Sequence, residues 1–381
     1  MKAIASLPIN NVANVAPTTK RVVFCFDGTS QDPSDAIQKS ETSDEGSISN
    51  VLKLHLLFGG DLVKGNKHKD LQQHSLYYSG VGTTGKNPVA GLLEQAFALG
   101  DPKEIVDEAM NDLKNVPRGA EIVVVGFSRG AAIARQFCST MAKQQEAYVV
   151  SLLLCFDTVA SIGMPDLSAS NRPSSNVVFE DKTRSVSEII QHAVHCVSLD
   201  DKRTIFQPTL MNHDERVLEI WFAGAHSDIG GGYQKDGLSD VVLEFAMEQI
   251  KKTTSLKMLS ENAISYEDVE PVLLDDIEIS PNVLDKNHEQ KSLIPFWLSP
   301  LHYHRRLVVV DNDEITLQHV PIVHESVIER IRRDSNYRPQ SLIDAARYTV
   351  WTPDGVSTIM KGIDDTETRI EPASKRRRKQ F

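Results

Sequence analysis

The segment VVVGFSRGAAIARQF, residues 123–137, contains the pattern G-x-S-x-G at Gly126, Ser128 and Gly130. In this motif a serine lies between a strand and a helix with a positive φ, a backbone conformation that costs a non-glycine residue about 1–3 kcal/mol. The flanking glycines let neighbouring backbone pack closely enough to sustain it. Here an apolar run precedes the turn and small residues follow it. Two interpretations of Ser128 stay open: a nucleophile on a strained turn, or the N-cap of the following helix.

Apolar runs and helix-like segments alternate on both sides of this turn. Several of the runs are too hydrophobic for a one-sided strand, which indicates central parallel strands covered on both faces. The alternation predicts an α/β fold with a mostly parallel, doubly wound sheet and helices on both faces. The predicted strands lie in 21–26, 74–82, 120–128, 147–161 and 216–233, and the predicted helices are 49–58, 101–115, 130–143, 185–197 and 238–250.

The chain is expected to form one catalytic domain with short extensions. Residues 1–20 are predicted to be a disordered leader, 21–355 the domain, and 356–381 a polar, basic tail. Residues 255–300 are more irregular and proline-containing, which favours a lid-like insertion. Three interpretations of the cluster Lys375–Lys379 stay open: a solvated tail, a contact for anionic lipid, or a nuclear-localisation-like signal.

Composition limits the classes of partner. The formal net charge of −11 gives no support for nucleic-acid binding. No apolar run approaches the ~18–20 residues of a membrane span. The four cysteines lie far apart in apolar segments, which indicates buried thiols and a reducing compartment such as the cytoplasm. No metal-ligand spacing occurs, so neither a metal nor another cofactor is predicted.

A nucleophilic serine needs a base, and the base needs an orienting acid. Asp157 follows the next predicted strand, and His226 follows a later one. Groups at the carboxyl ends of parallel strands gather at one edge of the sheet, so we expect Ser128, Asp157 and His226 to form a triad. Asp157 as a turn residue and His226 as a loop cap are the alternatives. Asp228 is a rival acid.

Two further rivals, Asp200 and Asp201, follow a predicted helix and are placed less favourably. Histidines 192 and 195 would lie three apart on that helix, where packing is the more natural role.

An acyl-transfer site also needs donors for a developing oxyanion. The backbone N–H of Arg129, after the serine, is one candidate, and Gly28 and Thr29 are the second. Asp27, Gly82 in the loop GVGTTG (80–85), and Asp228 are expected near the substrate. The Arg129 side chain either meets a phosphate headgroup or pairs with a surface acid. Neither glycine-rich loop matches a nucleotide-binding motif, so nucleotide binding ranks low.

Several motifs, in order, resemble the α/β-hydrolase domain typified by the type VI secretion phospholipase effectors. They are FCFDGTS, YYSGVGTTG, VVGFSRGAAIAR, CFDTVASIGMP, HAVHCVSLDDKR, WFAGAHSDIGGGY, GLSDVVLEF and VHESVIERI, and the resemblance spans residues 20–350. It implies an α/β-hydrolase fold, a lipase or esterase of phospholipase A type, and a lipid or ester substrate. It also implies delivery by a type VI secretion system.

The family's serine, aspartate and histidine fall on Ser128, Asp157 and His226. Two departures from the family are expected to matter. We expect no long C-terminal membrane-facing module like that of the large secreted effectors, and Ser30 stands where a bulky aromatic is usual.

The leading hypothesis is a serine hydrolase of carboxylic esters, with glycerophospholipids as substrates. The alternative is a catalytically silent binding or scaffold protein on the same fold, since fold alone does not give function. A phosphatase or nucleotide hydrolase using Asp27 ranks lower, because the sequence lacks the metal-ligand cluster it would need.

Overall fold

The structure is a computed structural model of the 381-residue chain. It describes residues 16, 18–28, 45–62, 71–80, 102–144, 148–160, 186–203, 206–264, 277–288, 304–357 and 359–363. Most of the predicted leader and tail, and more than half of the predicted lid-like region, lie outside these residues. The predicted domain boundaries stay predictions.

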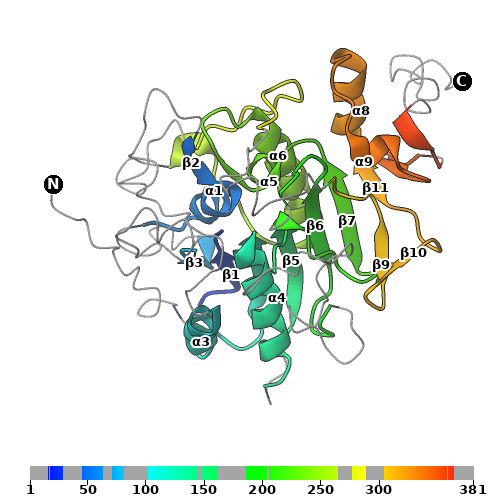
Figure 1. The fold of residues 1–381 in the computed structure, drawn as a ribbon. Helices are drawn as coiled ribbons and strands as arrows, with labels where there is room; N and C mark the ends of the chain where they lie inside the picture. Colours follow the sequence, from blue (N-terminus) through cyan, green and yellow to red (C-terminus); the bar gives the residue numbers. More distant parts are fainter. Residues whose placement is uncertain are drawn as a thin grey trace, which may run out of the picture.

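A central sheet organises the described residues. Its strands are β1 (Arg21–Phe26), β3 (Gln73–Tyr78), β4 (Glu121–Phe127), β5 (Val150–Phe156), β6 (Ala193–Ser198), β7 (Val217–Phe222), β11 (Ile322–His324), β12 (Thr349–Thr352) and β13 (Gly355–Val356). Within the described chain these nine strands follow the order β13-β12-β11-β7-β6-β5-β4-β1-β3 (Figure 1). Neighbours pair in parallel except β12 and β13.

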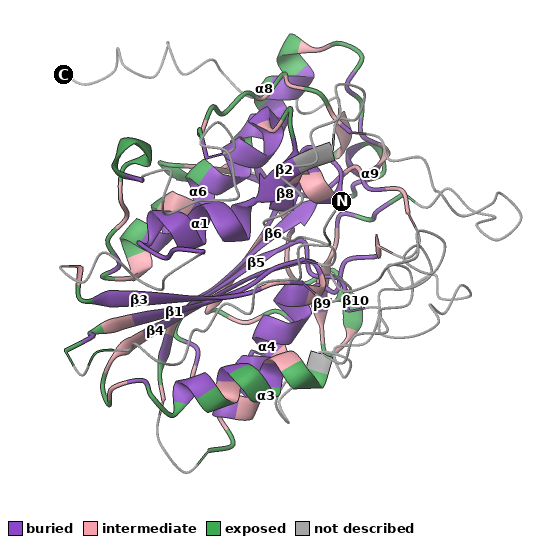
Figure 2. Cartoon of the chain, turned by 90° about the vertical axis from the view of Figure 1, so that its left-hand side faces the viewer, coloured by how far each residue is buried: buried purple, intermediate pink, exposed green. Residues whose placement is uncertain are grey.

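Helices cover both faces of this sheet. They are α1 (Asn50–Leu57), α3 (Pro102–Leu113), α4 (Arg129–Met141), α5 (His226–Gly230), α6 (Gly237–Thr253), α8 (Glu325–Arg333) and α9 (Gln340–Ile343). Figure 2 shows α1 and α6 on one face and α3 and α4 on the other. Two small sheets lie outside these layers, β2 (Glu45–Ser49) with β8 (Gly231–Tyr233), and β9 (Val309–Asp311) with β10 (Glu314–Thr316). The predicted α/β-hydrolase-like, doubly wound sheet is confirmed.

The two-sided covering explains the continuous apolar runs. In β4, Val123 and Val125 join the core cluster that includes residues of α1 and α6, whereas Val124 joins the cluster that includes residues of α3 and α4. Alternate side chains of one strand therefore enter two separate cores, and both sets have to be apolar. Each of these valines is fully buried.

The helix predicted over residues 185–197 is wrong. Residues 186–192 form turns, bends and an isolated bridge at Ile190, and 193–198 form β6, which pairs with β5 and β7. All six residues of β6 are buried, so the segment lacks the alternation that identifies a half-buried strand, and a short apolar run does not distinguish strand from helix. Asp200 and Asp201 consequently follow a strand, at the same edge of the sheet as the other candidate residues.

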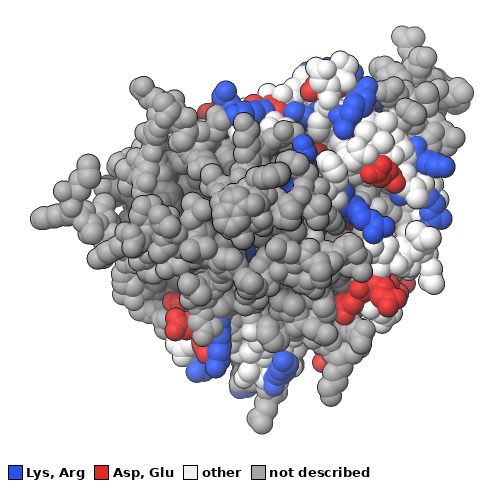
Figure 3. All heavy atoms as spheres, in the orientation of Figure 1, with Lys and Arg blue, Asp and Glu red and all other residues white. Residues whose placement is uncertain are grey.

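The four cysteines are buried free thiols, as predicted. Burial raises the pKa of Cys25 to about 12. No helix in the described part of the chain has the length and apolarity needed to span a bilayer. On the described part of the face in Figure 3, over α8, α9 and β10, side chains of both charges are interspersed.

A buried ion cluster joins α1 to α6. The Lys53 ammonium donates to Asp236 (2.7 Å) and Asp240 (2.8 Å), and the side chains of Lys53 and Asp240 are almost completely buried. Asp240 also accepts the backbone N–H of Ser280 at 2.7 Å. Burial alone would lower the pKa of Lys53, but the two carboxylates reverse this and hold it above its ordinary value. The lysine therefore stays charged inside the core.

Replacing Lys53 should measure how much stability is lost when the carboxylates of Asp236 and Asp240 have no cation to pair with. We expect Lys53→Met to lower the free energy of unfolding by about 3–5 kcal/mol, because removing one partner of a buried pair leaves an uncompensated charge. The control is Arg333→Met, whose pair with Glu329 is more than half exposed and should be worth less than about 1 kcal/mol. Urea unfolding of both variants measures the difference. Equal midpoints for the two variants would contradict the expectation.

Candidate active site

Ser128 lies on a strained turn between β4 and α4. Its backbone adopts φ 56° and ψ −123°, in a region that L-residues rarely occupy. Its side chain makes no capping hydrogen bond to α4, although it stands at the N-cap position. The interpretation of Ser128 as a capping serine is therefore wrong. The hydroxyl is instead available to groups above the sheet edge.

Close backbone packing on both sides holds this turn. A Cβ on Gly130 would lie 2.3 Å from the carbonyl oxygens of Phe26 and Asp27, and one on Gly126 would lie 2.6 Å from the Cα of Ala131. The two glycines of the motif thus let α4 approach the ends of β1 and β4. The Ser128 N–H donates to the carbonyl of Phe156 at 3.0 Å, which ties the turn to the end of β5.

The three predicted site residues meet at this edge. His226, the first residue of α5, has its Nε2 2.8 Å from Ser128 Oγ and its Nδ1 2.6 Å from Asp157 Oδ2. An ionised carboxylate only accepts hydrogen bonds, so Nδ1 carries a proton. In the neutral imidazole Nε2 is then the acceptor facing the serine hydroxyl. The arrangement is that of a hydroxyl, a base in the correct tautomer, and an orienting acid.

Asp157 is completely buried at the end of β5, with a φ of 39°. Its Oδ1 accepts the Ser198 N–H (3.0 Å) and one Arg305 nitrogen (2.5 Å), and its Oδ2 accepts the other Arg305 nitrogen (2.9 Å) as well as His226. Burial would raise the pKa of Asp157, but Arg305 and then His226 outweigh it and hold the pKa far below its ordinary value. The acid is thus a fixed anion.

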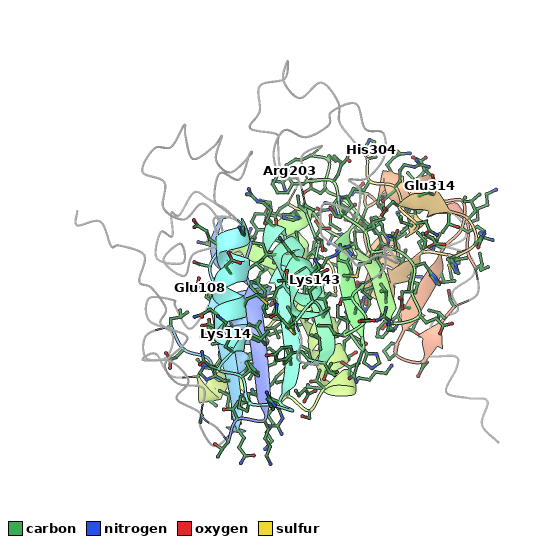
Figure 4. All side chains as sticks on the ribbon, turned by 90° about the horizontal axis from the view of Figure 1, so that it is seen from below. Glu108, Lys114, Lys143, Arg203, His304 and Glu314 are labelled. Atoms are coloured by element: carbon green, nitrogen blue, oxygen red, sulfur yellow. The ribbon has the colours of Figure 1, made fainter. Side chains whose placement is uncertain are left out.

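Sequence reasoning missed Arg305. It lies between His304 and Arg306, and no sequence motif around it indicates a role in the site. Figure 4 labels its neighbour His304 along the top of the view, on the same side as Arg203.

The imidazole of His226 is enclosed on several sides. The rings of Phe127 and Phe206 each lie 4.8 Å from it, centroid to centroid. Its backbone N–H donates to Asp201 at 3.1 Å, and Asp201 in turn pairs with Arg203. Burial lowers the pKa of His226, and the opposing pull of Asp157 does not restore it. At neutral pH the imidazole is therefore uncharged, and its Nε2 is free to accept a proton.

The rival acids have other partners. Asp228 accepts Nδ1–H of His288 at 2.6 Å and the backbone N–H groups of Ala225 and His288. Asp200 accepts the N–H of Gly224, the Asn287 amide and the Tyr337 hydroxyl, each at 2.8 Å. Both carboxylates thus fasten the loop that carries His226, and neither has a hydrogen bond to its ring among the described contacts.

One predicted oxyanion donor is already engaged. The N–H of Gly28 donates to the side chain of Asp27 at 2.7 Å, so in this structure it is engaged by Asp27. Asp27 is itself buried and accepts the hydroxyls of Ser49 (2.6 Å) and Tyr77 (2.7 Å). These contacts fix the carboxylate of Asp27 in place, and its position near the substrate stays a prediction. Thr29 and Gly82 lie outside the described residues.

Arg129 begins α4, where the helix dipole favours negative charge. Its N–H therefore stays the predicted oxyanion donor. Burial lowers the pKa of its guanidinium to about 10, which leaves it charged at neutral pH. Across the described ranges, no group of three or more His, Cys, Asp or Glu side chains is arranged to hold a metal ion.

A family model described as "T6SS, Phospholipase effector Tle1-like, catalytic domain" matches residues 20–145 and 136–249. Together the matches extend from residue 20 to residue 249, more than half of the 381-residue chain, and include Ser128, Asp157 and His226. The uncharacterized protein YEL023C of Saccharomyces cerevisiae is 25% identical over 256 residues, 52% of this chain and 33% of that protein. The chain thus matches about a third of the length of this relative.

Solved structures with a similar fold include three of low sequence identity. They are an uncharacterized protein from Pseudomonas aeruginosa (16% identity, TM-score 0.42, 68% of this chain and 49% of that chain), the Tle1 effector bound to the VgrG spike of the type 6 secretion system (23%, 0.36, 56% and 51%), and the apo form of Thermogutta terrifontis esterase 2 (14%, 0.36, 66% and 90%). The chain matches about half the length of the first two.

The close packing beneath the serine turn predicts that only glycine fits at position 130. Gly130→Ala should cost about 3 kcal/mol or more of unfolding free energy, since the three nearest atoms that the new Cβ would meet all belong to backbone and cannot rotate away. Gly119→Ala is the control: its φ is 77° and the new Cβ meets nothing within 4 Å, so only about 1 kcal/mol of backbone strain is added. Thermal and urea unfolding compare them. A loss at Gly130 no greater than at Gly119 would contradict the packing argument.

Proposed function

Because the chain belongs to the family of Tle1-like phospholipase effector catalytic domains, we propose that it is a serine hydrolase that cleaves carboxylic esters of lipids. The observation that carries the proposal is the hydrogen-bonded chain from Ser128 through His226 to Asp157. Each neighbouring pair in it is at hydrogen-bond distance, and the base is unprotonated at neutral pH. Esters suit such a site because an activated hydroxyl attacks an acyl carbon directly.

In the proposed reaction Ser128 Oγ attacks the acyl carbonyl while His226 Nε2 accepts its proton. Asp157 stabilises the imidazolium that forms and keeps the proton on Nδ1. The tetrahedral intermediate collapses when His226 returns the proton to the leaving alcohol, which breaks the ester bond and leaves an acyl-enzyme. Water, deprotonated by His226, then releases the fatty acid and restores Ser128. The N–H of Arg129 is the proposed donor to the oxyanion.

Glycerophospholipids are the proposed substrates, with cleavage of phospholipase A type. The family description supports this choice. Arg129, a cation that follows the nucleophile directly in sequence, is compatible with an anionic headgroup. Contact with an anionic membrane surface and synthesis in the cytoplasm stay predictions. Delivery by a type VI secretion system also stays a prediction, supported by the family description and by the Tle1 effector solved on its VgrG spike.

The reaction class is tested by its products. Incubated with mixed phosphatidylcholine and phosphatidylglycerol vesicles, the protein should release fatty acid and lysolipid, identified by mass spectrometry. Ser128→Ala should reduce the rate about 10³-fold or more without changing the circular dichroism spectrum.

Two results would overturn the proposal. Release of phosphate or headgroup in place of fatty acid would exclude phospholipase A chemistry. Full turnover by Ser128→Ala would exclude the serine mechanism. A fluorophosphonate probe that fails to label wild type at Ser128 would favour a silent scaffold.

Two matched carboxylates test the assignment of the acid, because Asp157 and Asp228 each hold a histidine Nδ1 at 2.6 Å. Asp157→Asn should lower kcat about 10³- to 10⁴-fold, since an amide favours the wrong tautomer of the base. Asp228→Asn should stay within about tenfold of wild type, because its histidine does not face the serine. Steady-state hydrolysis of a short-chain ester measures both. A reversed ranking would reassign the acid.

A further inference from the structure

The strongest contact of the triad acid is with Arg305, a residue 148 positions away in sequence. Both terminal nitrogens of its guanidinium reach the carboxylate of Asp157, one at each oxygen, at 2.5 and 2.9 Å. Both side chains are almost completely buried. Such a planar, two-point contact fixes the rotation of a carboxylate far more tightly than a single donor does.

Arg305 also reaches two backbone carbonyls that belong to the walls of the site. It donates to the carbonyl of Ser198 at 3.0 Å, at the end of β6, and to that of Phe206 at 2.6 Å. The ring of Phe206 packs on the imidazole of His226 at an interplanar angle of 66°. One guanidinium therefore holds the acid, the adjacent strand end and an aromatic neighbour of the base.

The charge of Arg305 acts on the base through the acid. An isolated buried carboxylate next to an imidazole strongly favours the imidazolium. Here the carboxylate is shared with a cation, so its pull on the His226 proton is reduced. Within the described part of the chain, the other charged groups that act on His226 are Asp201, which favours the imidazolium, and Arg203, which disfavours it. Asp201 and Arg203 pair with each other at 2.6 Å, whereas Arg305 pairs directly with the carboxylate of Asp157.

We propose that Arg305 is a positioning residue of this site, which aligns Asp157 toward Nδ1 of His226 and keeps the resting imidazole unprotonated into mildly acidic solution. The inference rests on the proposed function for its catalytic consequence. It has two separable parts, alignment through the two-point contact and tuning through the positive charge. A residue that only supported the fold would affect neither the protonation of His226 nor the pH profile.

Two substitutions separate the parts. Arg305→Gln keeps a donor for Asp157 but removes the charge, and should raise the pKa of His226 by about one to two units. The acidic limb of the kcat/KM profile should move to higher pH by the same amount. Arg305→Lys keeps the charge but loses the planar fork, so we expect kcat to fall about tenfold while the limb stays within about half a unit of wild type.

Arg216→Gln is the matched control. Arg216 also forms a two-point contact with an aspartate, Asp214, and donates to three backbone carbonyls, but it precedes β7 at the opposite edge of the sheet. Its loss should lower the unfolding midpoint and leave the pH profile unchanged. If Arg216→Gln moves the limb as far as Arg305→Gln does, the effect is general destabilisation and the inference is overturned.

A titration without turnover separates this inference from the proposed function. The pKa of His226 is read by NMR of ¹⁵N-histidine protein carrying Ser128→Ala, with the resonance identified by its loss in His226→Gln. A higher pKa of His226 in the variant that also carries Arg305→Gln supports the tuning, even if no ester is hydrolysed. An unchanged or lower pKa overturns the tuning, even if hydrolysis is normal. If Arg305→Gln does not fold, Arg305→Lys carries the test, and wild-type kcat in that variant overturns the alignment.

Discussion

The site depends on one backbone constraint, the left-handed conformation of Ser128 between a buried strand and a helix. Such a conformation persists only where the surroundings over-determine it. Here α4 lies so close to β1 that a single Cβ at Gly130 would overlap two carbonyl oxygens. The end of β5 completes the constraint, because Phe156 accepts the Ser128 N–H and Val159 donates to the Ser128 carbonyl. The strain thus turns the hydroxyl away from the helix and toward His226.

The site residues at the ends of parallel strands could be predicted from sequence, whereas side-chain contacts made by distant segments could not. Asp157 and His226 follow apolar runs, and parallel strands bring such positions to one edge whatever the connecting loops do. Arg305 has no comparable signal, because its contact with Asp157 depends on how the chain returns to the sheet. The strand β6 was missed for a related reason. A run buried on both faces carries no period, so only its pairing with β5 and β7 shows that it is a strand.

Among the described residues, three histidine–carboxylate pairs lie in or near the site, and hydrogen bonding distinguishes their roles. In β6, His195 Nε2 accepts the Thr158 N–H while its Nδ1 faces Glu219 at 2.9 Å, so both ring nitrogens serve to fix the residue after the acid. His288 pairs with Asp228 and stacks on Tyr233. In His226 the ring bridges an acid and a serine hydroxyl. The same pair of groups therefore stabilises a loop in two places and orients a base in the third.

The family match ends at residue 249, but the described site does not. Asn287 and His288 fasten the loop of His226 through Asp200 and Asp228, and Arg305 holds the acid. The charges of Asp157 and Arg305 have opposite effects on His226, since Asp157 favours a charged imidazole and Arg305 opposes it. Removing the cation would strengthen the base but also favour its protonation before any substrate arrives. The buried cation next to the acid therefore makes His226 a weaker base but leaves a larger fraction of it uncharged before substrate binds. The residue that has this effect, Arg305, lies beyond the stretch that the family model matches.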